Sequence, residues 1–237
     1  MYRPWRTIPI LTALLTIACT TTVPPSIPTV SREPPADFPT EVYRQARERG
    51  EPVYAVDPHQ SQAVIRVYRG GRLARFGHDH VVAARDIHGY ALLPADIAAA
   101  RADLYVLLDS LSVDEPALRA QAGLDTTPSA SDIEGTRRNM LDKSLEAQHH
   151  PVARLHLTRS EGAYPAPVLN AAITLHGVTR TYPVPVQMEI TERSLRVRGH
   201  FALNQTDFAM VPYSLLGGAL AVQDQVDIAF ELVGLRP

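Results

Sequence analysis

The residues best suited to chemistry in this chain are two histidines that flank an aspartate, in the segment His78-Asp79-His80. If the segment is extended, both imidazoles point to one face of a strand and the carboxylate points to the other. Three interpretations fit such a pair. It is a hydrogen-bonded cluster that fixes a strand or turn, a polar contact for a ligand head group at the mouth of a pocket, or a metal site.

A metal site needs a third ligand, and His150 is the candidate that we name beside His78 and His80. No spacing in the sequence brings His150 near the pair, so the pattern alone is weak evidence for a metal. His176 precedes Gly177 between two predicted strands. We interpret it as a turn histidine that bonds the backbone.

The motifs of common enzyme classes are absent from the sequence: no Gly-x-Ser-x-Gly elbow, no glycine-rich phosphate loop and no His-Glu-x-x-His. Asp79 could form an acid–base pair with either neighbouring histidine, but no nucleophile stands out. The sequence therefore predicts a protein that is not an enzyme. The formal net charge is −2 and no long basic run occurs, which argues against a nucleic-acid partner.

The first 40 residues are typical of export rather than of a folded core. Residues 1–18 combine two arginines with a short apolar stretch, as in a signal peptide. Cys19, the only cysteine, follows directly and resembles the lipid-modified residue of a bacterial lipoprotein. Residues 19–40 are rich in proline and favour an extended tether. These features predict a membrane-anchored lipoprotein on the periplasmic face of a bacterial cell envelope, at the outer membrane if the organism is Gram-negative.

Residues 41–237 form one predicted domain, in which apolar and polar residues alternate with the period of half-buried strands. The clearest pair is 182–190 and 195–203, joined by a short turn. Many antiparallel strands, each apolar on one face, favour a β-sandwich or a β-barrel. The other predicted strands are 63–68, 81–93 with a break near Asp86, 104–108, 152–158, 169–175 and 226–232.

Two helices interrupt this pattern. Residues 39–49 predict a short helix with Thr40 as its N-cap. Residues 131–147 predict an inserted helix with Ser131 as its cap, and the preceding residues 112–130 are interpreted as a loop.

Four groups of motifs, which follow one another along the chain in the family's order, resemble the YceI-like family of lipocalin-like proteins that bind polyisoprenoid lipids. The resemblance covers roughly residues 53–234. The His-Asp-His segment suits a subgroup of that family rather than all of it. The matching motifs are Tyr54-Ala55-Val56-Asp57-Pro58-His59-Gln60-Ser61, Asp114 with the later His150-Pro151-Val152-Ala153, Leu175-His176-Gly177-Val178-Thr179-Arg180, and Gln205-Thr206-Asp207-Phe208 with Asp224-Gln225-Val226-Asp227-Ile228.

The resemblance implies an all-β fold, an extended eight-stranded antiparallel lipocalin-like barrel with one inserted helix, a short N-terminal helix and a tunnel along its axis. Physical reasoning agrees, because about eight strands enclose room for side chains or for one slender ligand. An apolar inner face would hold an isoprenoid tail with roughly 25 cal/mol per Å² of apolar surface removed from water. We therefore expect a protein that binds, carries or buffers an amphipathic isoprenoid-type lipid and needs no other cofactor. The alternative is a metal-binding envelope module that uses His78 and His80.

The ligand contacts follow from the alternation and from the polar segment. Phe76, His78 and His80 are the candidates near the polar end of the ligand. Sequence cannot separate a filled barrel from a hollow one, so each apolar candidate is either core or tunnel lining. A homodimer is an open alternative to a monomer. The inward-facing apolar candidates are Val184, Val186, Met188, Val197, Phe201, Ile228 and Phe230.

Overall fold

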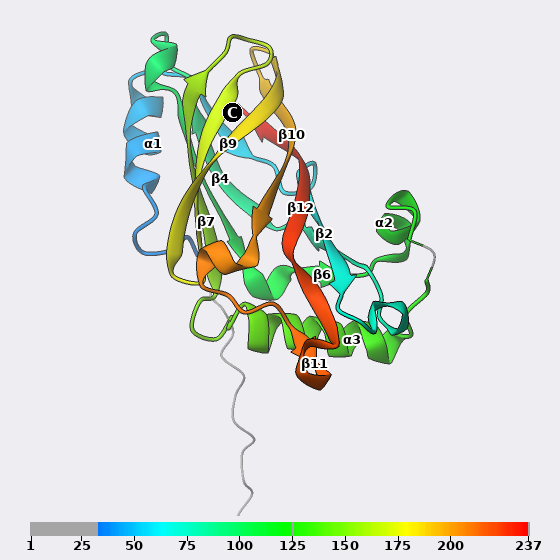
Figure 1. Cartoon of the computed structure of the whole chain (residues 1–237). Helices are drawn as coiled ribbons and strands as arrows, with labels where there is room; N and C mark the ends of the chain where they lie inside the picture. Colours follow the sequence, from blue (N-terminus) through cyan, green and yellow to red (C-terminus); the bar gives the residue numbers. More distant parts are fainter. Residues whose placement is uncertain (1–32, 125, 237) are drawn as a thin grey trace, which may run out of the picture.

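The computed structural model describes residues 33–124 and 126–236. The predicted signal peptide, Cys19 and the first part of the predicted tether lie outside the described residues. Within them the chain forms a strongly twisted antiparallel sheet that closes on itself (Figure 1). Its closed ring follows the order β1 (Val53–Val56), β4 (Ile87–Leu92), β5 (Arg101–Leu107), β7 (Val152–Glu161), β8 (Val168–Leu175), β9 (Val178–Ile190), β10 (Ser194–Asn204) and β12 (Leu220–Leu235).

The long strand β12 closes the barrel. One of its edges pairs with β10 along the whole length of β10. The other edge pairs with β1 near Leu235 and with β2 (Gln62–Gly70) from Ala221 to Glu231. The wall therefore continues from β12 through β2 to β3 (His80–Ala84) and β6 (Ser112–Val113), and β11 (Ser214–Leu215) pairs with the start of β12. The expected eight-stranded barrel is confirmed, with this extra sheet added at one end.

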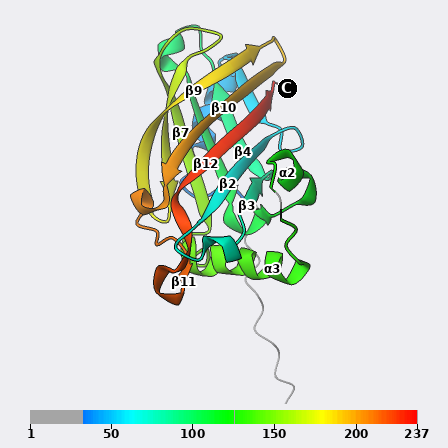
Figure 2. The same cartoon turned by 45° about the vertical axis from the view of Figure 1, so that its right-hand side comes forward.

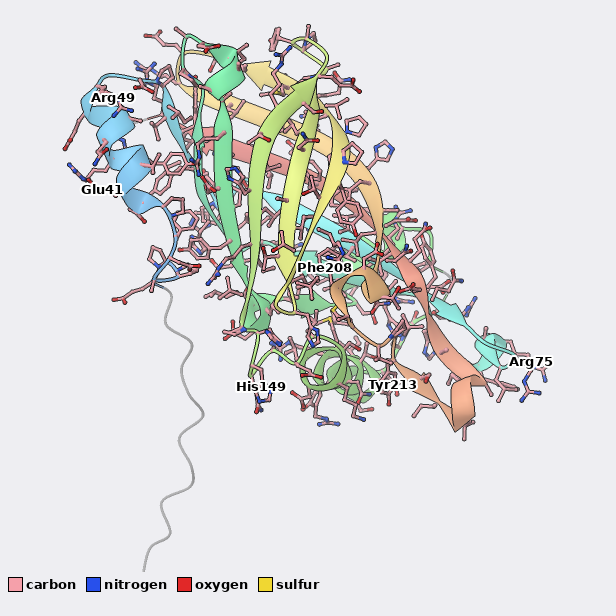
Figure 3. The ribbon with its side chains drawn as sticks, turned by 60° about the vertical axis from the view of Figure 1, so that its left-hand side comes forward. Glu41, Arg49, Arg75, His149, Phe208 and Tyr213 are labelled. Atoms are coloured by element: carbon pink, nitrogen blue, oxygen red, sulfur yellow. The ribbon has the colours of Figure 1, made fainter. Side chains whose placement is uncertain are left out.

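Strand β9 changes its partner half-way along, and two prolines explain where. Residues up to Pro185 pair with β8, whereas pairing with β10 begins only at Val186. Proline has no N–H to donate to a ladder, so Pro183 and Pro185 limit the pairing of this part of β9. The 3₁₀ helix η5 (Gln205–Phe208) packs there, and Phe208 is fully buried against the barrel (Figure 3).

Helix α1 (Thr40–Glu48) lies against the outside of the barrel and is fixed by a buried polar contact. The Tyr43 hydroxyl donates to Asp103 Oδ2 over 2.5 Å, and Arg101 and His156 also donate to that carboxylate. Burial and the hydrogen bond to Asp103 both raise the pKa of Tyr43, so the phenol stays protonated as the donor. The predicted helix is confirmed, but Thr40 is its first residue and no side chain caps it.

Removing the Tyr43 hydroxyl tests how strongly this contact holds α1. Tyr43→Phe leaves the buried Asp103 carboxylate with one donor fewer, and we expect the free energy of unfolding to fall by about 1–3 kcal/mol. Denaturant unfolding measures the change. Tyr90→Phe is the matched control, because Tyr90 packs in the same cluster and its hydroxyl makes no hydrogen bond within the described residues. Equal losses in both variants would contradict the proposed anchor.

Helix α3 (Ala130–Asn139) lies across the lower end of the barrel, and the π-helical turn η4 (Met140–Ser144) extends it (Figures 1 and 2). The predicted cap Ser131 is wrong, because Ser129 and Asp132 form a reciprocal capping box instead. The predicted loop at 112–130 also contains β6 and a second helix, α2 (Pro116–Gln121), whose start is marked by proline. The remaining short 3₁₀ turns are η1 (Ala74–Phe76), η2 (Ile97–Ala99), η3 (Leu108–Ser110) and η6 (Leu216–Gly218).

Candidate functional site

Two large apolar cavities lie inside the barrel as the described residues form it. The larger one, about 610 Å³, lies between the strands and helix α3, and its size falls in the range of small-molecule pockets. The smaller one, about 140 Å³, lies towards the opposite end of the strands. The two cavities share four lining residues, which therefore form the partition between them: Leu104, Leu157, Phe230 and Leu232.

Phe230 contributes the largest side chain to this partition, and a glycine makes room for it. Gly199 of β10 is the cross-strand partner of both Phe230 in β12 and Val186 in β9. A Cβ at Gly199 would lie 2.7 Å from Cζ of Phe230, so only glycine leaves space for the ring in this position. Val186, Gly199 and Phe230 therefore form a row across β9, β10 and β12, and the position of this row along the barrel axis is where the interior is divided.

The apolar residues predicted to face inward fall into three groups. Val184, Phe201 and Ile228 line the larger cavity, and Phe230 lines both cavities. Met188 and Val197 line only the smaller one. Val186 lines neither cavity, because it is buried in the row that carries the partition. Whether these residues bind a ligand stays a prediction.

The predicted polar candidates also gather at the larger cavity. Phe76, His78 and His80 all line it, and the two imidazole centroids lie 6.3 Å apart. Asp79 points elsewhere, since its carboxylate accepts from the backbone N–H of Arg69 at 2.8 Å. The alternation expected for an extended His-Asp-His segment therefore matches the structure. Helix α3 faces these residues with Ser131, Asp132, Thr136 and Asn139.

His80 is held by a buried acidic group, Asp114, that no spacing in the sequence links to it. Its Nδ1 lies 2.6 Å from Oδ2 of Asp114. The other oxygen of Asp114 accepts from the backbone N–H of Val81 and from Nη1 of Arg119, at 3.1 and 2.7 Å. Arg119 in turn donates to the backbone carbonyls of Asp79 and Thr126. This network fixes the orientation of the His80 imidazole at the wall of the cavity.

The charge state of Asp114 follows from these partners. Burial by itself would raise the pKa of the carboxyl, but the hydrogen bonds from His80 and Val81 and the Arg119 guanidinium outweigh it and lower the pKa. The carboxylate is therefore ionised at neutral pH. An ionised carboxylate can only accept, so Nδ1 of His80 carries a hydrogen and donates it in the bond to Asp114, and Nε2 is the second polar atom of the ring.

The metal alternative built on His78, His80 and His150 is wrong in its third member. His150 packs against His176, with ring centroids 4.6 Å apart, and joins Glu146 rather than the His78 pair. Among residues 33–124 and 126–236, Glu146, His150 and His176 form the only group of three side chains placed closely enough to hold a metal. His176 bonds the backbone as predicted, with Nδ1 3.2 Å from the carbonyl of Phe208.

Comparison with known proteins decides the family. A model of the YceI-like domain matches residues 54–234 of the chain. The chain belongs to the YceI-like domain family. Among curated proteins, none matches it.

Solved structures agree on the fold of this YceI-like domain. BcnA from Burkholderia cenocepacia is similar with a TM-score of 0.55 and 15% identity, over 75% of this chain and 98% of that protein. A polyisoprenoid-binding domain from Saccharophagus degradans, implicated in plant cell wall breakdown, is similar with a TM-score of 0.55 and 14% identity, over 78% and 98%. At these identities the likeness concerns the barrel fold alone.

Proposed function

We propose that this YceI-like domain binds the apolar tail of an amphipathic, isoprenoid-type lipid inside the barrel. The observation that carries the proposal is the larger cavity, which is lined mostly by apolar side chains and carries the imidazoles of His78 and His80 and polar residues of α3 in its wall. The solved polyisoprenoid-binding domain with the same fold supports this choice of ligand class. The tail would occupy the apolar part, and the polar end of the lipid would lie near His80.

Burial of the tail accounts for retention without any chemical step. Each methylene removed from water contributes about 0.8 kcal/mol, so affinity rises with the length of tail that the cavity accepts. The oriented imidazole of His80 adds one polar contact at a fixed place, which selects the orientation of the lipid rather than its affinity. The domain therefore acts as a binding and carrying module.

The lower rim of the barrel is a suitable entrance for such a tail. Phe76 and Leu215 line the cavity and are also exposed, with 65% and 46% of their surface accessible. Leu216 follows Leu215 in the sequence and is 75% accessible. Exposed apolar groups at a cavity mouth shorten the path over which a lipid tail would contact water.

We place this activity in the bacterial cell envelope, on the periplasmic side of the membrane. The support is the sequence of the N-terminal region, where Cys19 follows an apolar segment and precedes a proline-rich tether. In the part of the chain that the structure describes, no helix is long and apolar enough to cross a membrane. Metabolic labelling with a fatty acid tests the anchor, and Cys19→Ser should abolish the label.

Native mass spectrometry of the full chain, purified from its own envelope fraction, tests the lipid proposal. We expect a bound mass that organic extraction releases, with fragments spaced by isoprene units. A protein that carries no lipid and does not take up prenyl lipids from vesicles would contradict the proposal. A bound lipid with a straight acyl tail would keep the carrier role and replace the ligand class.

Phe230 should set the length of the tail. In Phe230→Ala the largest of the four side chains in the partition is removed, so a longer tail can extend into the smaller cavity. Each additional buried methylene should add about 0.8 kcal/mol to the binding free energy. Affinities for prenyl lipids of increasing length measure this shift.

Ile228→Ala is the matched control for Phe230→Ala. It enlarges only the larger cavity and leaves the partition in place, so the preferred tail length should stay unchanged. An unchanged length preference in Phe230→Ala, in a variant with the wild-type circular dichroism spectrum, would show that the partition does not limit the tail.

A further inference from the structure

Two turns at the lower end of the barrel bring three potential metal ligands together. Glu146 and His150 lie in the turn that follows η4, where the Glu146 carbonyl accepts from the N–H of His150 at 3.0 Å. His176 occupies the two-residue turn between β8 and β9. The ligand atoms of these three side chains all lie within 4.8 Å of one another.

The His176 imidazole has one nitrogen fixed and the other without a partner. Nδ1 lies 3.2 Å from the carbonyl oxygen of Phe208, and a carbonyl can only accept, so Nδ1 carries the hydrogen. Nε2 is buried and makes no hydrogen bond within the described residues. The nearest oxygen of Glu146 is 3.7 Å away, too far for a hydrogen bond.

Buried side-chain nitrogens without a partner are rare in folded proteins, so this one needs an explanation. A metal-ligating histidine typically donates its other ring N–H to a backbone carbonyl or carboxylate, which orients the free nitrogen toward the metal. His176 has this arrangement, since Phe208 holds Nδ1, Nε2 is the nitrogen nearest the Glu146 carboxylate, and the His150 ring packs beside the His176 ring.

His150 approaches the same point because the turn contains a glycine. A Cβ at Gly177 would lie 3.1 Å from Cε1 of His150 and 3.5 Å from its Nδ1, which is tighter than usual contacts. Gly177 therefore leaves room for the ring beside His176. Glu146 is half exposed, so its carboxylate can rotate toward the two imidazoles without disturbing the core.

We propose that Glu146, His150 and His176 form a site for a divalent transition metal ion, with zinc as the best fit. Two imidazoles and one carboxylate are a ligand set that zinc takes in tetrahedral sites with a fourth, open position. Tetrahedral bonds of this type place ligand atoms about 3.4 Å apart, so small side-chain rotations complete the site from the spacing seen here. The site is independent of the lipid proposal, because neither imidazole lines the larger cavity.

A metal bound here would connect the segment that closes the lower end of the barrel to the strands β8 and β9. Leu145 and Leu175 line the larger cavity, and each is adjacent in sequence to a ligand, Glu146 or His176. A bound ion would therefore link the segment after η4 to the β8–β9 turn. We expect zinc to raise the melting temperature of the protein.

Equilibrium dialysis of the chelator-treated full chain against zinc tests the site, in a Cys19→Ser background that removes the only thiol. We expect one zinc ion per chain. His176→Asn should weaken binding at least about tenfold, because loss of even a hydrogen-bond partner of a metal ligand costs that much. Asparagine is a good choice because His176 has φ 51° and Gly177 has φ 75°, and Asn-Gly is a preferred sequence for such a turn. Loss of zinc in a folded His176→Asn protein therefore reports on the ligand.

The controls use the other histidines and a spectroscopic probe. His149→Ala changes an exposed neighbour in the same turn and should leave binding unchanged (Figure 3). Cobalt in place of zinc should give the visible absorption of a tetrahedral site in the His149 variant and none in His176→Asn. Three results would each overturn the proposal. The first is that the protein binds no zinc, and the second is that the double variant His150→Ala, His176→Asn binds zinc as the wild type does. The third is that only the double variant His78→Ala, His80→Ala loses zinc.

Discussion

Phe201→Glu is expected to abolish lipid retention while the barrel stays closed. Phe201 lines the larger cavity, and its ring lies near the rings of Tyr182 and Phe230, at centroid distances of 6.1 and 6.4 Å. A carboxylate at this position would remain ionised only with bound water, and an apolar tail cannot replace that water without a large penalty. Co-purified lipid, measured by native mass spectrometry, should fall below detection.

His200→Glu is the matched control for this change. His200 is the preceding residue of the same strand, and it is exposed on the outer face of the barrel because side chains alternate. It introduces the same charge one position away, and lipid retention should equal that of the wild type. Circular dichroism and melting curves establish that both variants are folded. If folded Phe201→Glu still retains lipid, the larger cavity is not the binding site.

The wall of this cavity was largely predictable from the sequence. A strand with one buried face repeats every two residues, so local order alone places Val184, Phe201 and Ile228 on the inner side. The same rule placed His78 and His80 together and Asp79 apart. These predictions need only the strand itself and no knowledge of its neighbours.

The division of the cavity was not predictable in the same way. Val186 follows the alternation and is buried, but it lies in the row in which Phe230 packs over Gly199. Which residue lines a cavity and which lies behind another side chain depends on the register of three strands. That register is a property of the closed barrel and leaves no local pattern in the sequence.

Contacts between turns that are distant in the sequence could not be predicted either. The sequence suggests His150 as a partner of the His78 pair, whereas in the structure the turn after η4 packs against the β8–β9 turn and brings His150 to His176. The one usable signal was His176-Gly177, a dipeptide that suits a tight turn with positive φ at both positions. It locates the turn, but what packs against the turn is set by the tertiary fold.

Asp114→Asn is expected to lower the free energy of unfolding at neutral pH by about 3–5 kcal/mol. The carboxylate and the Arg119 guanidinium are both almost fully buried, so removing the negative charge leaves the cation without its partner. Asp114 has φ 54°, a conformation that asparagine also accepts, and the change therefore adds no backbone strain. Lipid binding should weaken as well, because the His80 ring loses the group that orients it.

The pH dependence distinguishes this charge effect from a simple packing defect. The pKa of Asp114 is lowered in the folded protein from an ordinary value of 3.8, so its contribution is complete above that value and is lost as the pH falls below it. The difference in stability between wild type and Asp114→Asn should stay constant from neutral pH down to about 5 and shrink below about 3.8. Asp109→Asn, at an exposed site that also precedes α2, should show no such difference. A gap that does not change with pH would mean that the shape of the side chain, rather than its charge, holds Arg119 and His80 in place.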